Sequence, residues 1–219
     1  MNKGNKRILF LAAGLLAAFA VWTVLVMTVE VRPVGPETSS VGMATLNKAF
    51  HDLTGVNMWL YDVTDLLSII PLCFIAGFAM LGLVQLIRRK SLFKVDRDIL
   101  ILGGFYVVVM AVFVTFELLA VNYRPVLIKG VLEASYPSST TMLVMCVMPT
   151  AAMQLGRRIK GNIIRRCIII AITTFTVLMV TARLISGVHW ISDIIGGALL
   201  SVGLVMGYRY FVGGTAKNK

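Results

Sequence analysis

The sequence is poor in cysteine, histidine and acidic residues, and each shortage narrows what the protein can be. Among 219 residues there are 3 cysteines, 2 histidines and 10 acidic residues. Cys73, Cys146 and Cys167 lie inside apolar segments and lack the short spacing of metal ligands, so we expect them to pack as small apolar side chains. No disulfide, metal centre or other cofactor is predicted.

The shortage of acidic residues leaves a formal net charge of +11, because lysine and arginine together number 21. A charge of this size can indicate nucleic-acid binding. Here, however, the basic residues stand in short runs between apolar segments and form no patch interleaved with aromatic residues. We therefore expect no nucleic-acid partner and interpret the basic runs as signals of membrane topology.

Apolar residues dominate the chain, since 58% are hydrophobic and the mean hydropathy is +0.87. This composition differs from that of soluble domains and predicts an all-α integral membrane protein. Six apolar runs predict six transmembrane helices in one membrane domain, residues 1–219; the runs cover about 8–27, 66–87, 99–121, 137–155, 167–188 and 190–212. The first run is too long for a signal-peptide core, so residues 1–29 are predicted to be an uncleaved anchor.

A more polar connection, residues 30–64, separates the first two runs. Within it Met43, Leu46, Phe50 and Leu53 recur at helical spacing, with polar residues elsewhere on the helical wheel. This pattern predicts a short amphipathic helix that lies on the outer membrane surface. The remaining core is residues 65–212, and residues 213–219 are a short basic tail.

The distribution of basic residues predicts that both termini are cytoplasmic. With the N-terminus inside, 16 of the 21 lysines and arginines lie on the inner side, as the positive-inside rule requires. Ionisable groups at membrane depth are costly and are therefore functional candidates. This threading brings polar residues from three separate connections to the outer surface; they are Arg124, Ser138, Arg183, His189 and Asp193.

His189 and Asp193 are spaced for a shared chemical task. If a helix begins near Trp190, these two side chains, four residues apart, lie on one face. A carboxylate can then hold one imidazole nitrogen as N–H and leave the other with a free lone pair. In that state histidine acts as a nucleophile or a base.

Three segments together resemble the membrane branch of the type 2 phosphatidic acid phosphatase superfamily. They are Arg124-Pro125, then Pro137-Ser138-Ser139-Thr140, then Arg183 followed by five residues, His189, three residues and Asp193. The third segment is nearly complete, with Ala182 in place of the family's serine. In the first two segments Glu117 replaces a lysine, Ser139 a glycine and Thr140 a histidine. The resemblance covers about residues 60–212, including the six-helix layout.

The resemblance implies a phosphohydrolase that works through a phosphohistidine. In the family, the histidine corresponding to His189 attacks phosphorus, and the aspartate corresponding to Asp193 orients it. Arg124 and Arg183 would hold the phosphoryl oxygens and stabilise the charge of the transition state, a task suited to planar guanidinium groups.

The resemblance also implies an anion cradle at a helix N-terminus. Pro137 suits the first turn of a helix, so Ser138, Ser139 and Thr140 would offer backbone N–H groups and hydroxyls to a phosphate. The family's proton donor to the leaving alkoxide, however, is the histidine that Thr140 replaces. Three explanations stay open: a leaving group such as phosphate that needs little protonation, a substitute acid such as His51, or lipid phosphate binding without cleavage.

We therefore predict a lipid phosphatase or phosphotransferase in a multi-pass cell membrane of the bacterial plasma type, with its site on the extracytoplasmic face. The preferred substrate is a polyprenyl diphosphate, followed by phosphatidate-like monoesters. No metal is implied, because arginines and a helix terminus would balance the phosphate charge. The main alternative is a degenerate family member that binds or carries lipid phosphate. A small-solute transporter is a weaker alternative, because the charges do not meet at the membrane midplane. The oligomeric state is left open.

Overall fold

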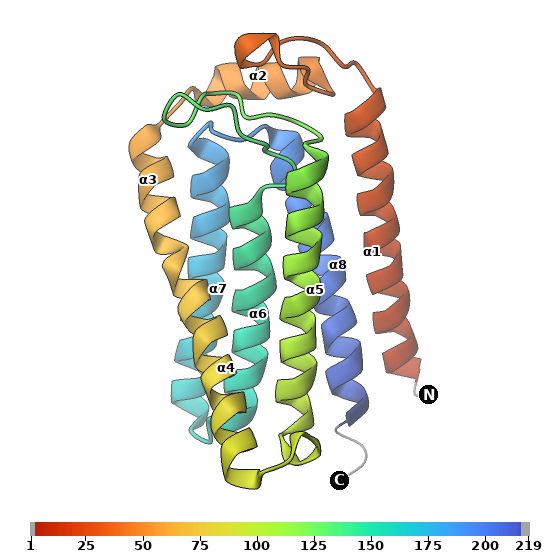
Figure 1. The fold of residues 1–219 in the computed structure, drawn as a ribbon, viewed down its shortest axis with the longest axis vertical. Helices are drawn as coiled ribbons and strands as arrows, with labels where there is room; N and C mark the ends of the chain where they lie inside the picture. The colour runs from red at the N-terminus through yellow and green to blue at the C-terminus, as the bar shows by residue number, and fades with distance from the viewer. Residues whose placement is uncertain (1–2, 216–219) are drawn as a thin grey trace.

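The computed structural model describes residues 3–215 as a bundle of long helices (Figure 1). Among these residues, six helices of 20 or more residues run along the long axis; they are α1 (Lys3–Thr28), α4 (Ile69–Arg89), α5 (Arg97–Leu119), α6 (Ser139–Arg158), α7 (Asn162–Ile185) and α8 (Ile191–Thr215). Helix α2 (Ala44–Thr54) lies across one end of the bundle, and α3 (Met58–Leu67) leads directly into α4. The one-turn helices η1 (Pro36–Thr38) and η2 (Leu92–Lys94) lie in connections. The all-α prediction is confirmed.

Five helical segments are long and apolar enough to cross a membrane; they are Gly4–Thr28, Met58–Arg89, Arg97–Leu119, Asn162–Ile185 and Ile191–Gly213. Many of their large apolar side chains are exposed, as those of Phe10, Leu118 and Ile170 are. An apolar outer surface of this extent suits contact with lipid tails, where every backbone polar group must be satisfied within the helix.

Helix α6 is the one long helix that is not among these five segments, and it lies at the centre of the bundle. It packs against α4, α5, α7 and α8. Its buried side chains include several polar ones, among them Thr141, Thr150 and Gln154. A helix surrounded by protein can carry polar side chains that hydrogen-bond to its neighbours, as Thr150 does with Tyr106 at 3.2 Å. The expectation of six membrane spans, in which α6 would be the fourth along the chain, stays a prediction.

Several helices begin before their apolar runs; α1, for example, begins at Lys3 and not near Ile8. The second long helical segment begins at Met58, eight residues before Leu66, because α3 continues into α4 with a break only at Ser68. Helix α7 begins at Asn162, before the apolar run at Cys167. The polar residues just before this run, among them Arg165 and Arg166, are already helical. The amphipathic helix expected over Met43–Leu53 is present as α2.

The two ends of the bundle differ in structure. Helix α1 begins and α8 ends at one end, where the turn between α4 and α5 also lies (Figure 1). The longer connections 29–57 and 120–138, together with the turn 186–190, gather at the other end. All residues singled out from the sequence as site candidates therefore belong to, or stand near, that second end.

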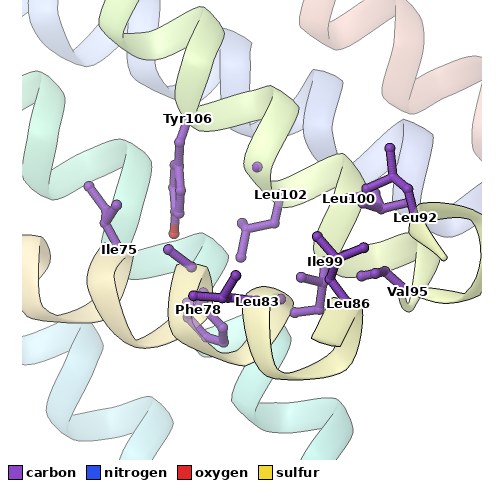
Figure 2. Close-up of a pocket in the computed structure, with 13 residues that line it drawn as sticks. Ile75, Phe78, Leu83, Leu86, Leu92, Val95, Ile99, Leu100, Leu102 and Tyr106 are labelled. Carbon is purple, nitrogen blue, oxygen red and sulfur yellow. The ribbon is translucent and has the colours of Figure 1, made fainter. Parts of the chain in front are cut away.

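An apolar pocket lies near the first end, far from those connections. Figure 2 shows side chains of α4, α5 and the turn between them around a cavity of about 450 Å³. Its lining is apolar except for the hydroxyl of Tyr106, which pairs with Thr150. Because this pocket offers no charged group, it cannot hold a phosphate.

Polar contacts join the connections to the start of α8. Trp22 of α1 donates its indole N–H to the carbonyl of Ser192 at 3.0 Å. Asn47 of α2 donates to the Ser192 hydroxyl at 2.9 Å and accepts from the Ser192 backbone N–H at 3.1 Å. The Gly42 backbone N–H donates to the side-chain oxygen of Asn122 at 3.2 Å. Helices α1 and α2 and the segment after α5 are thus fixed where α8 begins.

Candidate active site

His189 and Asp193 face each other at the junction of α7 and α8. His189 lies in the turn before α8, and Asp193 lies in the first turn of that helix. His189 Nδ1 is 3.5 Å from Asp193 Oδ2, and both side chains are buried. The same carboxylate oxygen accepts the backbone N–H of Trp190 at 3.0 Å, so the start of α8 fixes its position. The two side chains lie close together, as their spacing predicts, although Nδ1 of His189 makes no hydrogen bond within the described residues.

The surroundings of His189 favour its neutral form. Burial is the largest cause that holds the pKa of His189 well below its ordinary value of 6.5. The positive charges of Arg124 and Arg183 act in the same direction. At neutral pH the imidazole therefore keeps a free lone pair, and the Asp193 carboxylate favours placing the ring proton on Nδ1.

Arg124 lies against the other nitrogen of the same imidazole. Its Nη1 is 3.1 Å from His189 Nε2, and its side chain is almost fully buried. Arg124 Nε is 3.0 Å from Glu133 Oε2, which supplies a counter-charge. The indole N–H of Trp190 donates to the carbonyl of Tyr123 at 2.7 Å and so holds this segment beside the turn. The nitrogen with the free lone pair thus points toward a guanidinium.

Arg183 approaches the site from the last turn of α7 and is also buried. Its Nη1 donates to the Thr64 hydroxyl at 3.0 Å and to the Tyr61 carbonyl at 3.4 Å, both from α3. Its Nη2 is 4.0 Å from the exposed carboxylate of Asp65. The Nε–H of Arg183 has no hydrogen-bond partner among the described residues. That donor remains available to an anion.

The segment Ser138–Thr140 only partly matches the expected cradle. Ser138 is fully buried, and its backbone N–H donates to the Asp193 carbonyl at 3.1 Å. Its hydroxyl accepts from Thr141 at 3.1 Å, so Ser138 ties α6 to α8 and has no free N–H for a phosphate. Ser139 and Thr140 are the first two residues of α6, whose N–H groups have no carbonyl four residues earlier within the helix. The expectation for the Ser138 N–H is therefore wrong.

Comparisons with known proteins agree with this geometry. The family model of the PAP2 superfamily, the type 2 phosphatidic acid phosphatases, matches residues 117–216, which include both arginines and the His189–Asp193 pair. The chain thus carries a segment, residues 117–216, that matches the PAP2 superfamily. Its fold is similar to the crystal structure of the first transmembrane PAP2 type phosphatidylglycerolphosphate phosphatase from Bacillus subtilis. The TM-score is 0.63 at 16% identity, covering 95% of this chain and 98% of that one. The comparison with curated proteins finds no match.

Glu117 replaces the PAP2 lysine but does not pair with Arg124. Arg124 pairs with Glu133 instead, and Glu117 is exposed near the end of α5. Both glutamates line a cavity of about 300 Å³ together with Arg124 and Ser139. The cavity thus combines one buried cation with two carboxylates, where the family pattern would have two cations.

His51, the candidate substitute acid, packs against Trp190. Its ring centre is 5.4 Å from that of Trp190. Among the described residues it makes no hydrogen bond or ion pair with Arg124, Arg183 or His189. Burial lowers the pKa of His51, although the charge of Asp52 acts in the opposite direction. A histidine with a lowered pKa is mostly neutral at pH 7 and is therefore a poor general acid.

Several residues of this site were not found from the sequence. Asn122 donates to Asp193 Oδ1 at 3.5 Å, and Glu133 is the counter-ion of Arg124. Tyr61 contacts both arginines through its ring. The position of Asn122, two residues before Arg124, could have suggested its role. Tyr61 carries no such signal, because it lies more than 60 residues from the first motif.

Proposed function

We propose that this protein cleaves or transfers the phosphate group of a membrane lipid through a phosphohistidine at His189. One observation carries the proposal. Nε2 of a buried, neutral imidazole is 3.1 Å from a guanidinium, while Nδ1 faces a carboxylate at 3.5 Å. A phosphoryl group beside Arg124 would meet a lone pair on nitrogen, which is the arrangement that nucleophilic catalysis requires.

The proposed reaction has two steps. The lone pair of His189 Nε2 attacks phosphorus, and the bond from phosphorus to the leaving oxygen breaks as that oxygen takes the bonding electrons. Asp193 balances the positive charge that the imidazole gains, and Arg124 and Arg183 balance the phosphoryl oxygens. Water or an acceptor hydroxyl then attacks phosphorus, the phosphorus–nitrogen bond breaks, and one proton passes to solvent.

A polyprenyl diphosphate is the preferred substrate because of its leaving group. Thr140 cannot donate a proton at neutral pH, and general acid catalysis is worth about 10²–10⁴-fold. Attack on the terminal phosphorus of a diphosphate expels the polyprenyl monophosphate, which is stable as an anion, so the missing acid matters least for this substrate. Phosphatidate-like monoesters release an alkoxide and rank second. Phosphatidylglycerolphosphate, named for the similar B. subtilis structure, also carries such a monoester.

We place the site on the extracytoplasmic side of the membrane. The site lies at the end of the bundle opposite the start of α1 and the end of α8 (Figure 1). The basic runs 88–97 and 157–166 lie in the turns at the end that α1 and α8 share. The positive-inside rule assigns that end to the cytoplasm, so lipid phosphate would enter from the outer leaflet.

A non-catalytic lipid phosphate binder is the second candidate. Thr140 and Glu117 replace the family's acid and one of its cations, whereas both arginines are kept. Such a protein would lose ligand when Arg124 or Arg183 is replaced and would be largely indifferent to replacement of His189.

Phosphate release by the purified protein in detergent tests the proposal. The substrates are a polyprenyl diphosphate, a polyprenyl monophosphate and phosphatidate, each with the wild-type protein and with His189→Ala. Release from the diphosphate alone, lost in the variant, supports phosphohistidine chemistry without a proton donor. Release from all three, also lost in the variant, supports the same nucleophile with a substitute acid. Binding without release from any substrate contradicts the enzyme and favours the binder.

The pH dependence of the reaction should reflect the lowered pKa of His189. A base whose pKa is lowered stays neutral until the pH falls below that lowered value. We therefore expect kcat/KM, corrected for ionisation of the substrate phosphate, to stay within about twofold between pH 8 and pH 6. A histidine of ordinary pKa would be only about one-quarter neutral at pH 6. A fall of that size, centred near pH 6.5, would contradict the assignment.

Replacing His51 should have little effect on any of these reactions. Since His51 is held by Trp190 and its pKa is lowered, His51→Gln is expected to keep kcat within about threefold for diphosphate and monoester alike. Initial rates at pH 7 measure this. A loss of about 100-fold or more that spares the diphosphate would identify His51 as the missing acid.

A further inference from the structure

Tyr61 touches both arginines of the proposed phosphate site. The guanidinium carbon of Arg183 is 4.6 Å from the centre of the Tyr61 ring, and that of Arg124 is 5.8 Å from it. Both distances are within the range of a cation–π interaction. Tyr61 lies on α3, which packs against α7. The residue is outside the segment 117–216 that matches the family.

The two arginines need such a contact because their charges oppose each other. Both side chains are buried, with exposed fractions of 6% for Arg124 and 1% for Arg183, and the charge of each acts on the other. Arg124 has a close counter-ion in Glu133. Within the described part of the chain, the one carboxylate that pairs with Arg183 is the exposed group of Asp65, at 4.0 Å. The negative face of an aromatic ring can offset this repulsion without competing for the N–H donors.

The position of Tyr61 is fixed by the contact between α3 and the turn before His189. The Asn57 backbone N–H donates to the Ser186 carbonyl at 2.9 Å. Gly187, with φ of 67°, approaches Gly55 so closely that a Cβ would lie 1.8 Å from the Gly55 carbonyl oxygen. Only glycine allows this contact. The backbone that precedes Tyr61 is therefore docked on the backbone that precedes the proposed nucleophile.

We propose that Tyr61 is a positioning residue for phosphate binding, whose ring holds the guanidiniums of Arg124 and Arg183 side by side so that one phosphoryl group meets both. This inference rests on the proposed function. Thr64 completes the arrangement, since its hydroxyl fixes Nη1 of Arg183 and leaves Nε free. Helix α3 thus contributes to the site in addition to the three motif-bearing segments.

Orthovanadate, an analogue of the phosphoryl group, tests the proposal as a competitive inhibitor and as a ligand in calorimetry. Tyr61→Leu should raise both its inhibition constant and its dissociation constant about tenfold, because two cation–π contacts are lost in a desolvated site. The KM for the lipid phosphate should rise by a similar factor. Tyr61→Phe keeps the ring and should stay within about twofold of the wild-type protein.

Trp59→Leu is the matched control, since Trp59 lies on the same helix with 72% of its surface exposed. It should leave orthovanadate affinity unchanged. Equal affinity in Tyr61→Leu and the wild-type protein would overturn the inference, as would a Tyr61→Phe variant as weak as Tyr61→Leu. If Tyr61→Leu does not fold, Tyr61→Phe and Tyr61→Trp decide, because both keep an aromatic face and must both bind.

The affinity measurement separates this inference from the proposed function. A wild-type protein that binds orthovanadate but hydrolyses no lipid would contradict the enzyme, while the Tyr61 variants would still support or refute the role of the ring. A wild-type protein that hydrolyses lipid with unchanged affinity in Tyr61→Leu would contradict only the inference. A wild-type protein that binds no orthovanadate would contradict both.

Discussion

Replacing His189 with alanine should reduce phosphate release by on the order of 10⁴–10⁶-fold, the range seen when a catalytic histidine is removed from an enzyme whose residues act as a unit. The reason is that His189 Nε2 is the nucleophile in the proposed reaction and its lone pair points toward Arg124. The loss should be in kcat. Binding of the lipid phosphate should persist within a few-fold, because the contacts of Arg183 with Thr64 and Tyr61 do not involve His189.

Single-turnover measurements with a radiolabelled lipid phosphate provide the check. The wild-type protein should acquire an acid-labile, base-stable label of the kind expected for a phosphorus–nitrogen bond, and His189→Ala should acquire none. His51→Gln serves as the control, since it removes the chain's other imidazole. Retention of more than about 1% of wild-type turnover by His189→Ala would rule out this nucleophile.

Replacing Asp193 with asparagine should have the second largest effect, a fall in kcat of about 10²–10³-fold. Asp193 Oδ2 accepts the Trp190 backbone N–H at 3.0 Å and faces Nδ1 of His189 at 3.5 Å. An asparagine oxygen can take that place and keep the proton on Nδ1. What disappears is the negative charge that balances the phosphorylated imidazole in a buried site, where one electrostatic partner is typically worth this factor.

Comparison with Asp193→Ala separates charge from orientation. Alanine removes both, so its kcat should fall at least tenfold further than that of Asp193→Asn. Lipid phosphate affinity should change little in either variant, because Asp193 does not contact the proposed phosphate site directly. Equal rates for Asp193→Asn and the wild-type protein would mean that the carboxylate has no electrostatic role.

The positions of the helices could be predicted from the sequence because lipid imposes a local requirement. A helix exposed to hydrocarbon must be apolar over its own length. The apolar runs therefore predicted the positions of α1, α4, α5, α7 and α8. The same holds for the amphipathic pattern of α2 and for the pairing of His189 with Asp193, whose spacing follows from a single helical turn. Each of these features depends on residues that are close in sequence.

Other features depend on contacts between distant segments and could not be predicted. Glu117 stands at the family's lysine position, yet the counter-ion of Arg124 is Glu133. The Ser138 N–H was expected to bind an anion but is taken by the Asp193 carbonyl, because α6 packs against the start of α8. Helix α6 carries polar side chains because it is surrounded by protein, a fact that its own composition cannot reveal.

The sequence by itself determined the helical membrane fold, the resemblance to the PAP2 superfamily and the closeness of His189 to Asp193, because apolar runs, charge runs and motif spacing are all local in the chain. The tertiary structure alone decided which groups surround that pair. It brought Arg124 to Nε2 of His189, packed His51 against Trp190, and set Tyr61 against both arginines. These contacts join residues that are tens of positions apart, and only the packing of the bundle fixes their distances.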